Sequence, residues 1–252
     1  MRRIFSSSLC TILFFVLQLP AFAQTAPQAP VYAVLSLVGD KLGVVVASAH
    51  PELNFAPYRR AALPVDSPLF DDGVISAAGI AIRKIVPNAE LSALNTRSPV
   101  LFDRQAVLFE EKGSVIAIPD AIKAAVQQQN ASYLVLVTKH RDDLKLRFDN
   151  HRPDGGTLEG VGFVVDDTSQ GTTREHGFIA PYAYLRVALI DAKTWNVIAK
   201  ETVVASSTMP ATRARDATRQ WGLMSPEEKA QSVDKLLRTE ISRVIPLLLK
   251  AG

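Results

Sequence analysis

The sequence predicts an α/β (α+β) fold in which a mixed sheet with long antiparallel strands carries two or three helices on one or both faces. Continuous apolar runs at Val31–Val38 and Tyr133–Thr138 are typical of strands that are buried on both sides. Alternating apolar and charged residues over Leu144–Phe148 are typical of an antiparallel strand with one face in water. An apolar stripe at helical spacing from Ala230 to Ile245 predicts an amphipathic C-terminal helix that docks on the core.

The composition is that of a globular protein. The chain has 252 residues, of which 48% are hydrophobic and 21% charged, and this argues against wholesale disorder, a collagen-like repeat or a polytopic membrane protein. The formal net charge is +3, with 28 basic and 25 acidic side chains. Removal of Arg2 and Arg3 would leave 26 basic side chains against 25 acidic ones, so no nucleic acid is expected as a partner.

Residues 1–23 contain the three parts of a cleavable signal peptide. Arg2 and Arg3 form a basic start, Leu9–Leu19 is an apolar run, and Ala21–Ala23 is an A-x-A cleavage site. The apolar run is shorter than the roughly 20 residues that a membrane-spanning helix needs. We therefore expect cleavage between Ala23 and Gln24, and a periplasmic or secreted protein with no membrane span.

The rest of the chain is expected to form a single α/β domain over residues 31–252, after a flexible Pro- and Ala-rich leader at 24–30. Cys10 is the one cysteine, and it would leave with the signal peptide. The exported protein would then contain no disulfide, so its stability would rest on its core alone.

Local patterns predict the order of the elements. Val31–Val38 and Leu42–Ala47 flank a turn at Gly39–Lys41 and are expected to pair as a hairpin. The segment His50–Phe70 contains four prolines and is expected to be a long loop, either a surface crossing or a functional one. Further strands are expected at Leu91–Leu94, Val115–Ile118, Leu158–Val165, Ala183–Leu189 and Val197–Ser206.

Three helices are expected. The first would be capped by Asp71 or Asp72 and end near Val86, and the second would span Asp120–Gln129. The third has a capping box formed by Ser225 and Glu228, with Pro226 at the first helical position and Pro246 expected to kink or end it.

No catalytic residue, metal ligand or cofactor is expected from the motifs. His140-Arg141-Asp142 resembles the start of a kinase catalytic loop, but Arg147 stands where that loop needs asparagine. The glycines at 155, 156, 160 and 162 precede a strand pattern, whereas a phosphate-binding loop opens a helix. Carboxylates and histidine at 142–143, 166–167 and 175–176 have no metal-binding spacing, and a solvated role is expected for them.

The best candidate for an interaction site is the loop Asp166–Pro181 with the start of the strand that follows. Polar loops that carry an exposed aromatic side chain are typical contact sites. An alternative places Phe178 at the edge of the core. The candidate interaction residues are Arg174, Glu175, His176, Phe178 and Tyr182.

A second candidate site is a ligand pocket at Gly160, Gly162 and Phe163. Both glycines lie on one face of the predicted strand Leu158–Val165 and leave that face without side chains. Another group can therefore pack closely against the strand there.

The order of the elements resembles that of bacterial envelope domains: the curli-secretion lipoprotein, the N-terminal domain of TolB and the outer-membrane activators of penicillin-binding proteins. The similar segments are VYAVLSLV (31–38), NASYLVLVT (130–138) and YLRVALIDAKTWNVIAKE (184–201). Trp195 replaces the glycine of their strand-turn-strand pattern, and the lipidation cysteine is absent. The resemblance implies a protein that binds other envelope proteins and catalyses nothing.

The function predicted from the sequence is that of an exported, soluble periplasmic accessory protein or interaction module, with another cell-envelope protein as its partner. The alternatives are a periplasmic small-ligand-binding protein and an unrecognised hydrolase. The sequence leaves the oligomeric state open.

Overall fold

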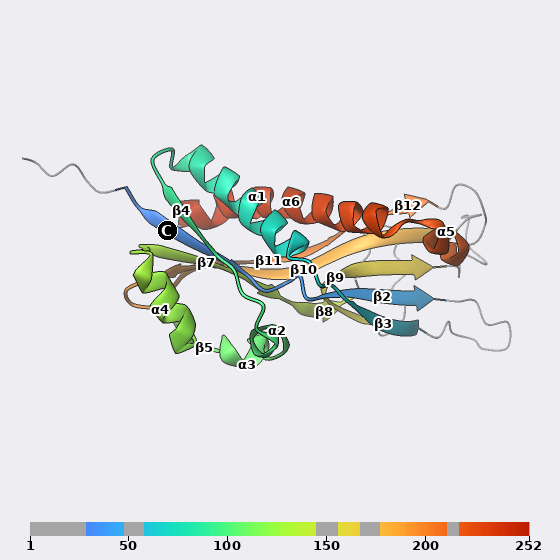
Figure 1. Cartoon of the computed structure of the whole chain (residues 1–252), viewed down its shortest axis with the longest axis horizontal. Helices are drawn as coiled ribbons and strands as arrows, with labels where there is room; N and C mark the ends of the chain where they lie inside the picture. Colours follow the sequence, from blue (N-terminus) through green and yellow to red (C-terminus); the bar gives the residue numbers. More distant parts are fainter. Residues whose placement is uncertain (1–28, 48–57, 145–155, 167–176, 211–216, 252) are drawn as a thin grey trace, which may run out of the picture.

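A mixed β-sheet with the strand order β3-β2-β9-β10-β7-β1-β4 forms the centre of the molecule (Figure 1). The computed structural model describes residues 29–47, 58–144, 156–166, 177–210 and 217–251. The strands are β1 (Val31–Ser36), β2 (Lys41–Ala47), β3 (Tyr58–Pro64), β4 (Glu90–Leu94), β5 (Glu111–Lys112), β6 (Val115–Ile116), β7 (Tyr133–Lys139), β8 (Arg141–Asp143), β9 (Thr157–Asp166), β10 (Phe178–Asp191), β11 (Val197–Ser206) and β12 (Met209–Pro210). The helices are α1 (Leu69–Ile85), α2 (Pro99–Asp103), α3 (Gln105–Leu108), α4 (Asp120–Gln128), α5 (Ala217–Leu223) and α6 (Pro226–Ala251). The predicted fold class is confirmed.

The sheet forks at β10. Residues 178–184 of β10 pair with β9 and residues 185–191 pair with β7, while β11 runs along 182–190. Since a strand has only two edges, β9 and β7 share one edge of β10 and β11 takes the other. One arm of the fork is β7-β1-β4 and the other is β9-β2-β3.

The predicted hairpin of the first two strands is wrong. β1 pairs in parallel with β7 and β4, whereas β2 pairs with β9 and β3, so the chain passes from one arm of the fork to the other between them. Leu37 and Val38 in this bend are fully buried. Two apolar runs around a short polar turn are typical of a hairpin, but here the bend lies inside the core and the strands find distant partners.

Helices cover both faces of the β7-β1-β4 arm, where the sequence predicted helices on one or both faces of the sheet. α1 and α6 lie side by side on one face, and α2, α3 and α4 lie on the other (Figure 1). Successive residues of β1 alternate between the two cores: Val34 packs in the core beneath α1 and α6, and Ala33 and Leu35 pack in the core with Ile122 of α4. This explains why the run is continuously apolar.

The C-terminal helix begins as predicted. The backbone N–H of Ser225 donates to the Glu228 carboxylate (2.8 Å), and the backbone N–H of Glu228 donates to the Ser225 hydroxyl (3.1 Å), which is the capping box. The helix continues through Pro246 to Ala251. Val244, Ile245 and Leu248 on both sides of the proline are buried, and this packing offsets the lost backbone hydrogen bond.

Asp71 does not cap the first helix. It lies inside α1, and its Oδ1 accepts hydrogen bonds from the Ser36 hydroxyl (2.5 Å) and the Val38 backbone N–H (2.9 Å). The carboxylate therefore holds the bend between β1 and β2. The segment expected to be one long loop also contains β3, and α2, α3 and α5 were not predicted.

Candidate functional site

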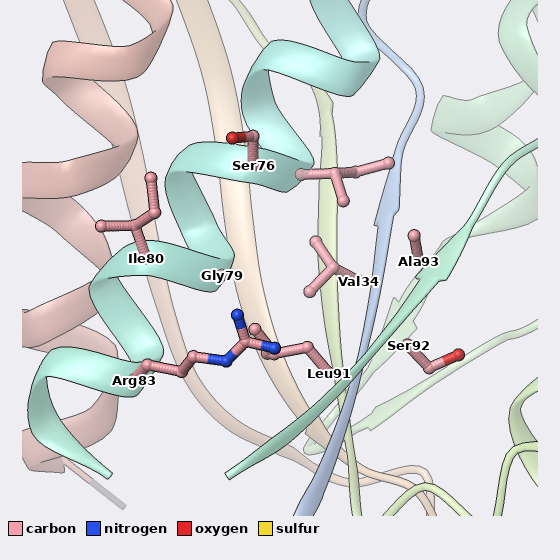
Figure 2. Close-up of a pocket in the computed structure, with 9 residues that line it drawn as sticks. Val34, Ser76, Gly79, Ile80, Arg83, Leu91, Ser92 and Ala93 are labelled. Atoms are coloured by element: carbon pink, nitrogen blue, oxygen red, sulfur yellow. The ribbon is translucent and has the colours of Figure 1, made fainter. Parts of the chain in front are cut away.

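A groove of about 250 Å³ lies between α1 and β4 (Figure 2). Its floor includes Val34 of β1, and its walls come from one face of α1 and from β4. It is formed at the end of the strand order, because β4 is the last strand of its arm. The site therefore combines a helix surface with the edge of a sheet.

The helical wall is formed by residues at one-turn spacing. Ser76, Gly79, Ile80 and Arg83 follow the i, i+3, i+4, i+7 pattern, which puts them on one side of the helix. Gly79 sets how closely α1 and β4 approach at the bottom of the groove, because a Cβ at this position would lie 2.9 Å from Cδ1 of Leu91. Glycine inside a helix costs about 1 kcal/mol relative to alanine, and here it lets β4 approach α1.

The strand wall follows the two-residue alternation of β4. Leu91 packs in the core beneath α1, whereas Leu94 packs against the core on the opposite face of the sheet. Figure 2 shows Leu91 directed toward α1 and the Ser92 side chain directed away from it. Ser92 therefore borders the groove through its backbone, and Leu91 and Ala93 present their side chains to it.

The backbone of β4 has a free edge beside the groove. The N–H of Glu90 donates to the carbonyl of Pro30 (3.1 Å), which directs the polar groups of Glu90 toward β1. Backbone groups of successive strand residues point to alternate edges. Those of Leu91 and Ala93 therefore point away from β1, and within the described residues no strand pairs with that edge.

Among the described residues that line the groove, Arg83 is the one with an ionisable side chain. Figure 2 shows its guanidinium group reaching across the groove toward Leu91. Among the described residues, no carboxylate lies within ion-pair distance of it. Ile80 is 66% exposed on the same face of the helix. The groove thus offers apolar surface, the free backbone edge of β4 and the cationic side chain of Arg83.

The two candidate interaction residues that the structure describes, Phe178 and Tyr182, do not line this groove. Arg174, Glu175 and His176 are outside the described residues. Phe178 is half-buried and packs against a core cluster, as the alternative interpretation expected, and Tyr182 in the same cluster is only 2% exposed. Burial raises the pKa of the Tyr182 phenol, and its ring contacts Tyr184 edge-on at 5.7 Å between centroids.

The face of β9 that carries the two glycines is covered by side chains of the same protein. A Cβ on Gly162 would lie 2.6 Å from the Tyr182 hydroxyl oxygen, and a Cβ on Gly160 would lie 3.1 Å from Cγ of Lys139. Gly160 also has a φ of +68°, which favours glycine. Phe163 is fully buried on the other face, 4.6 Å between centroids from Trp221.

A polar network lies where the sheet forks. Lys139 forms an ion pair with Asp40, and the Gln105 amide donates to the Leu37 carbonyl (3.1 Å) and accepts from the Lys139 N–H (2.8 Å). Burial raises the pKa of Asp71, and the negative charge of Asp40 raises it further. Because these groups bind one another and the bend at Leu37, we assign the network a structural role.

The described residues contain neither a cluster of metal ligands nor a membrane-spanning helix. In the part of the chain that the structure describes, no three His, Cys, Asp or Glu side chains gather as metal ligands would. Within the same residues, no helix has both the length and the apolar character needed to cross a membrane.

The groove was not predicted from the sequence. The apolar stripe of α1 and the extended segment at 91–94 were both recognised, but nothing in the local pattern indicates that they face each other. The usable signal was that Ile80 lies off the buried stripe of α1, beside Arg83 on the same helical face.

Comparison with known proteins assigns no family. No family model matches the chain, and no curated protein matches it. Among solved structures, a Xanthomonas campestris protein of the family DUF330 is 10% identical, with 91% of this chain and 90% of that chain covered and a TM-score of 0.39. A putative neuraminyllactose-binding hemagglutinin homolog from Helicobacter pylori is 10% identical, with 92% and 88% covered and a TM-score of 0.37.

A Neisseria meningitidis lipoprotein is 9% identical, with 88% of this chain and 99% of that chain covered and a TM-score of 0.30. Because every TM-score is below 0.5, the likenesses assign neither a family nor a function to this chain.

Proposed function

We propose that this protein is an exported, non-catalytic interaction module that binds an extended segment of another cell-envelope protein along β4. The observation that carries the proposal is the free edge of β4 beside an apolar groove that contains Arg83. A peptide that adds a strand to a sheet gains affinity from backbone hydrogen bonds and specificity from pockets for alternate side chains.

The backbone groups of Leu91 and Ala93 would supply the hydrogen bonds. A strand next to β4 would direct every second side chain toward the face that carries α1. There, Ile80 and Leu91 provide apolar contacts. The bound segment would therefore be apolar at alternate positions.

Arg83 favours a carboxylate on the bound segment, either an acidic side chain or a C-terminus. A guanidinium group donates two parallel hydrogen bonds to a carboxylate, which adds both energy and orientation. Since Arg83 and Leu91 face each other, this carboxylate would lie at the N-terminal end of β4.

The size of the groove favours a peptide over a small-molecule ligand. Pockets that enclose drug-sized ligands have volumes of about 300–1,000 Å³. The groove, at about 250 Å³, is smaller and is lined in part by the edge strand β4. It suits side chains of a segment that continues beyond it.

The order of the sequence features at residues 1–23 supports the proposed export. A basic start, an apolar run of limited length and an A-x-A site are what secretory signal peptides share. Comparison of the N-terminus of the periplasmic protein with the predicted start at Gln24 tests this part of the proposal.

A library of random hexapeptides with free C-termini tests the binding site. We expect the enriched peptides to alternate apolar residues and to carry a carboxylate. Arg83→Gln should weaken their binding about tenfold, the equivalent of about 1.4 kcal/mol. Lys84→Gln is the matched control, because Lys84 is an exposed neighbour that does not line the groove.

Two results would contradict the proposal. One is a library that enriches no peptide over the background. The other is a set of enriched peptides that bind the Arg83→Gln and Lys84→Gln variants equally well.

A further inference from the structure

β3 is a strand with both faces in water. It pairs with β2 and stands at the opposite end of the strand order from β4 (Figure 1). Every side chain from Arg59 to Pro64 is exposed. Within the described residues no strand pairs with the outer edge of β3, and such an edge offers unpaired backbone groups to another strand.

The hydrogen bonding of the chain just after β3 identifies which backbone groups are free. The N–H of Val65 donates to the carbonyl of Asp40, so Val65 points toward β2. By alternation, Arg59, Ala61 and Leu63 also point toward β2. The backbone groups of Arg60, Ala62 and Pro64 therefore point to the free edge. Pro64 has no backbone N–H, so it offers only its carbonyl there.

We propose that two copies of this protein dimerise by antiparallel pairing of β3 with β3 about a twofold axis at Ala61. In this register, Arg60 of each copy lies opposite Ala62 of the other copy, and the two residues exchange both backbone hydrogen bonds. Ala61 faces Ala61 across the axis. The two sheets become one continuous sheet through an interface in which each copy uses the same surface.

The neighbouring registers are less favourable for specific reasons. An axis at Arg60 would put two arginines directly opposite each other, and directly opposed like charges destabilise a strand pair. An axis at Ala62 would put Pro64 opposite Arg60, so a carbonyl in the middle of the paired segment would lack a donor. With the axis at Ala61, Pro64 lies opposite Tyr58, and the carbonyl without a donor is at the end of β3. A register shifted by a single residue would oppose free backbone groups to groups already bonded to β2.

The side chains also fit the axis at Ala61. The small Ala61 residues meet where the side chains of opposed strands come closest. Arg60 lies opposite the small Ala62, while its guanidinium group stays by Gly156 of its own copy, 3.4 Å from where a Cβ on Gly156 would lie. The aliphatic part of Arg59 covers Leu63, which is 45% exposed in one copy. The two Arg60 side chains lie only diagonally across from each other.

Cysteine cross-linking tests the register. The Ala61→Cys and Leu63→Cys variants are each made in the full chain together with Cys10→Ser, which removes the one native cysteine. Opposed residues of this type have Cα atoms about 4.5 Å apart, within the range for a disulfide. Ala61→Cys should therefore form a disulfide-linked dimer at least tenfold faster than Leu63→Cys, whose copies would lie roughly 13 Å apart along the strands.

Analytical ultracentrifugation tests the dimer itself. The unmodified protein should sediment as a dimer that dissociates on dilution. Ala62→Pro removes an N–H that faces the free edge, so it should leave the fold intact and weaken the dimer at least tenfold. Ala62→Ser keeps the N–H and should dimerise as the unmodified protein does, and thermal unfolding confirms that both variants are folded.

The proposal is overturned by a protein that stays monomeric at high concentration. It is also overturned by equal cross-linking of the Ala61→Cys and Leu63→Cys variants. A folded Ala62→Pro variant that dimerises as tightly as the unmodified protein would overturn it as well.

Discussion

The hydroxyl group of Tyr182 lies over Gly43, in the space that the Cβ of any larger residue at position 43 would occupy. Gly43 and Gly162 are directly paired in the parallel strands β2 and β9, and Tyr182 is paired with Gly162 from β10. Three neighbouring strands thus hold one buried tyrosine above two glycines. The absence of side chains on these glycines is explained by the ring that covers them.

Gly43→Ala should destabilise the protein by about 1–3 kcal/mol, because the new methyl group overlaps the Tyr182 hydroxyl. Tyr182→Phe in the same chain should recover much of the loss, since the next nearest atom of the ring lies 3.4 Å from the new Cβ. Urea denaturation of the two single variants and the double variant measures this coupling. A double variant that is less stable than Gly43→Ala would show that the overlap is not the cause.

Asp71→Asn should change how stability depends on pH. Burial raises the pKa of Asp71 above its ordinary 3.8, so the folded protein binds more protons than the unfolded chain between these two pKa values. The contribution of Asp71 is therefore fully present below about pH 3.8 and is lost as the pH rises through the folded-state pKa. We therefore subtract the unfolding free energy of Asp71→Asn from that of the unmodified protein at each pH. This difference should be lower at pH 6.5 than at pH 3.5.

Urea denaturation at both pH values checks this expectation. Asp72→Asn, at the exposed neighbouring carboxylate, removes the same charge and serves as the control. If the two variants show the same pH dependence, burial of Asp71 does not produce the effect.

Substitutions of Trp195 should separate backbone strain from packing. Trp195 has a φ of +60°, yet its side chain packs against the core around α4, with Lys123 Nζ at 6.0 Å from the ring centroid. Trp195→Ala loses the packing and keeps the strained φ, whereas Trp195→Gly loses both. We expect both variants to be less stable than the unmodified protein, and the glycine variant to exceed the alanine variant by about 1 kcal/mol in unfolding free energy.

Gly79→Ala should impair peptide binding without unfolding the protein. The gain in helix propensity of about 1 kcal/mol is opposed by the displacement of the Leu91 side chain, so stability should stay within about 1 kcal/mol. The methyl group projects into the groove and should weaken the library-derived peptides several-fold. Gly222→Ala in α5 is the control, because a Cβ there meets no atom of the described residues within 4 Å.

Sequence periodicity was sufficient to predict the strands and helices whose apolar pattern follows directly from which of their faces are buried. β1 and β7 were recognised because both of their faces are covered, and α6 because a capping box precedes a regular apolar stripe. The hairpin prediction failed because a bend through buried Leu37 and Val38 has the same local pattern as a turn. β3 was missed because its side chains lie in water on both faces and leave no apolar alternation.

The candidate site depends on contacts between segments that are distant in the sequence. Val34, Gly79 and Leu91 come together only because the chain returns after α1 and β4 pairs in parallel with β1. No local sequence pattern encodes this pairing. Asp71 illustrates the same limit, since its position suits a helix cap but its partner is a bend more than 30 residues away.

Because β3 and β4 lie at opposite ends of the strand order, the dimer interface and the peptide site do not overlap, and this determines how many peptide sites the dimer has. Pairing through β3 would leave the Arg83 groove of each copy accessible, so one assembly would present two equivalent peptide sites. A target that carries two suitable segments would then be held with an avidity that exceeds the affinity of either site.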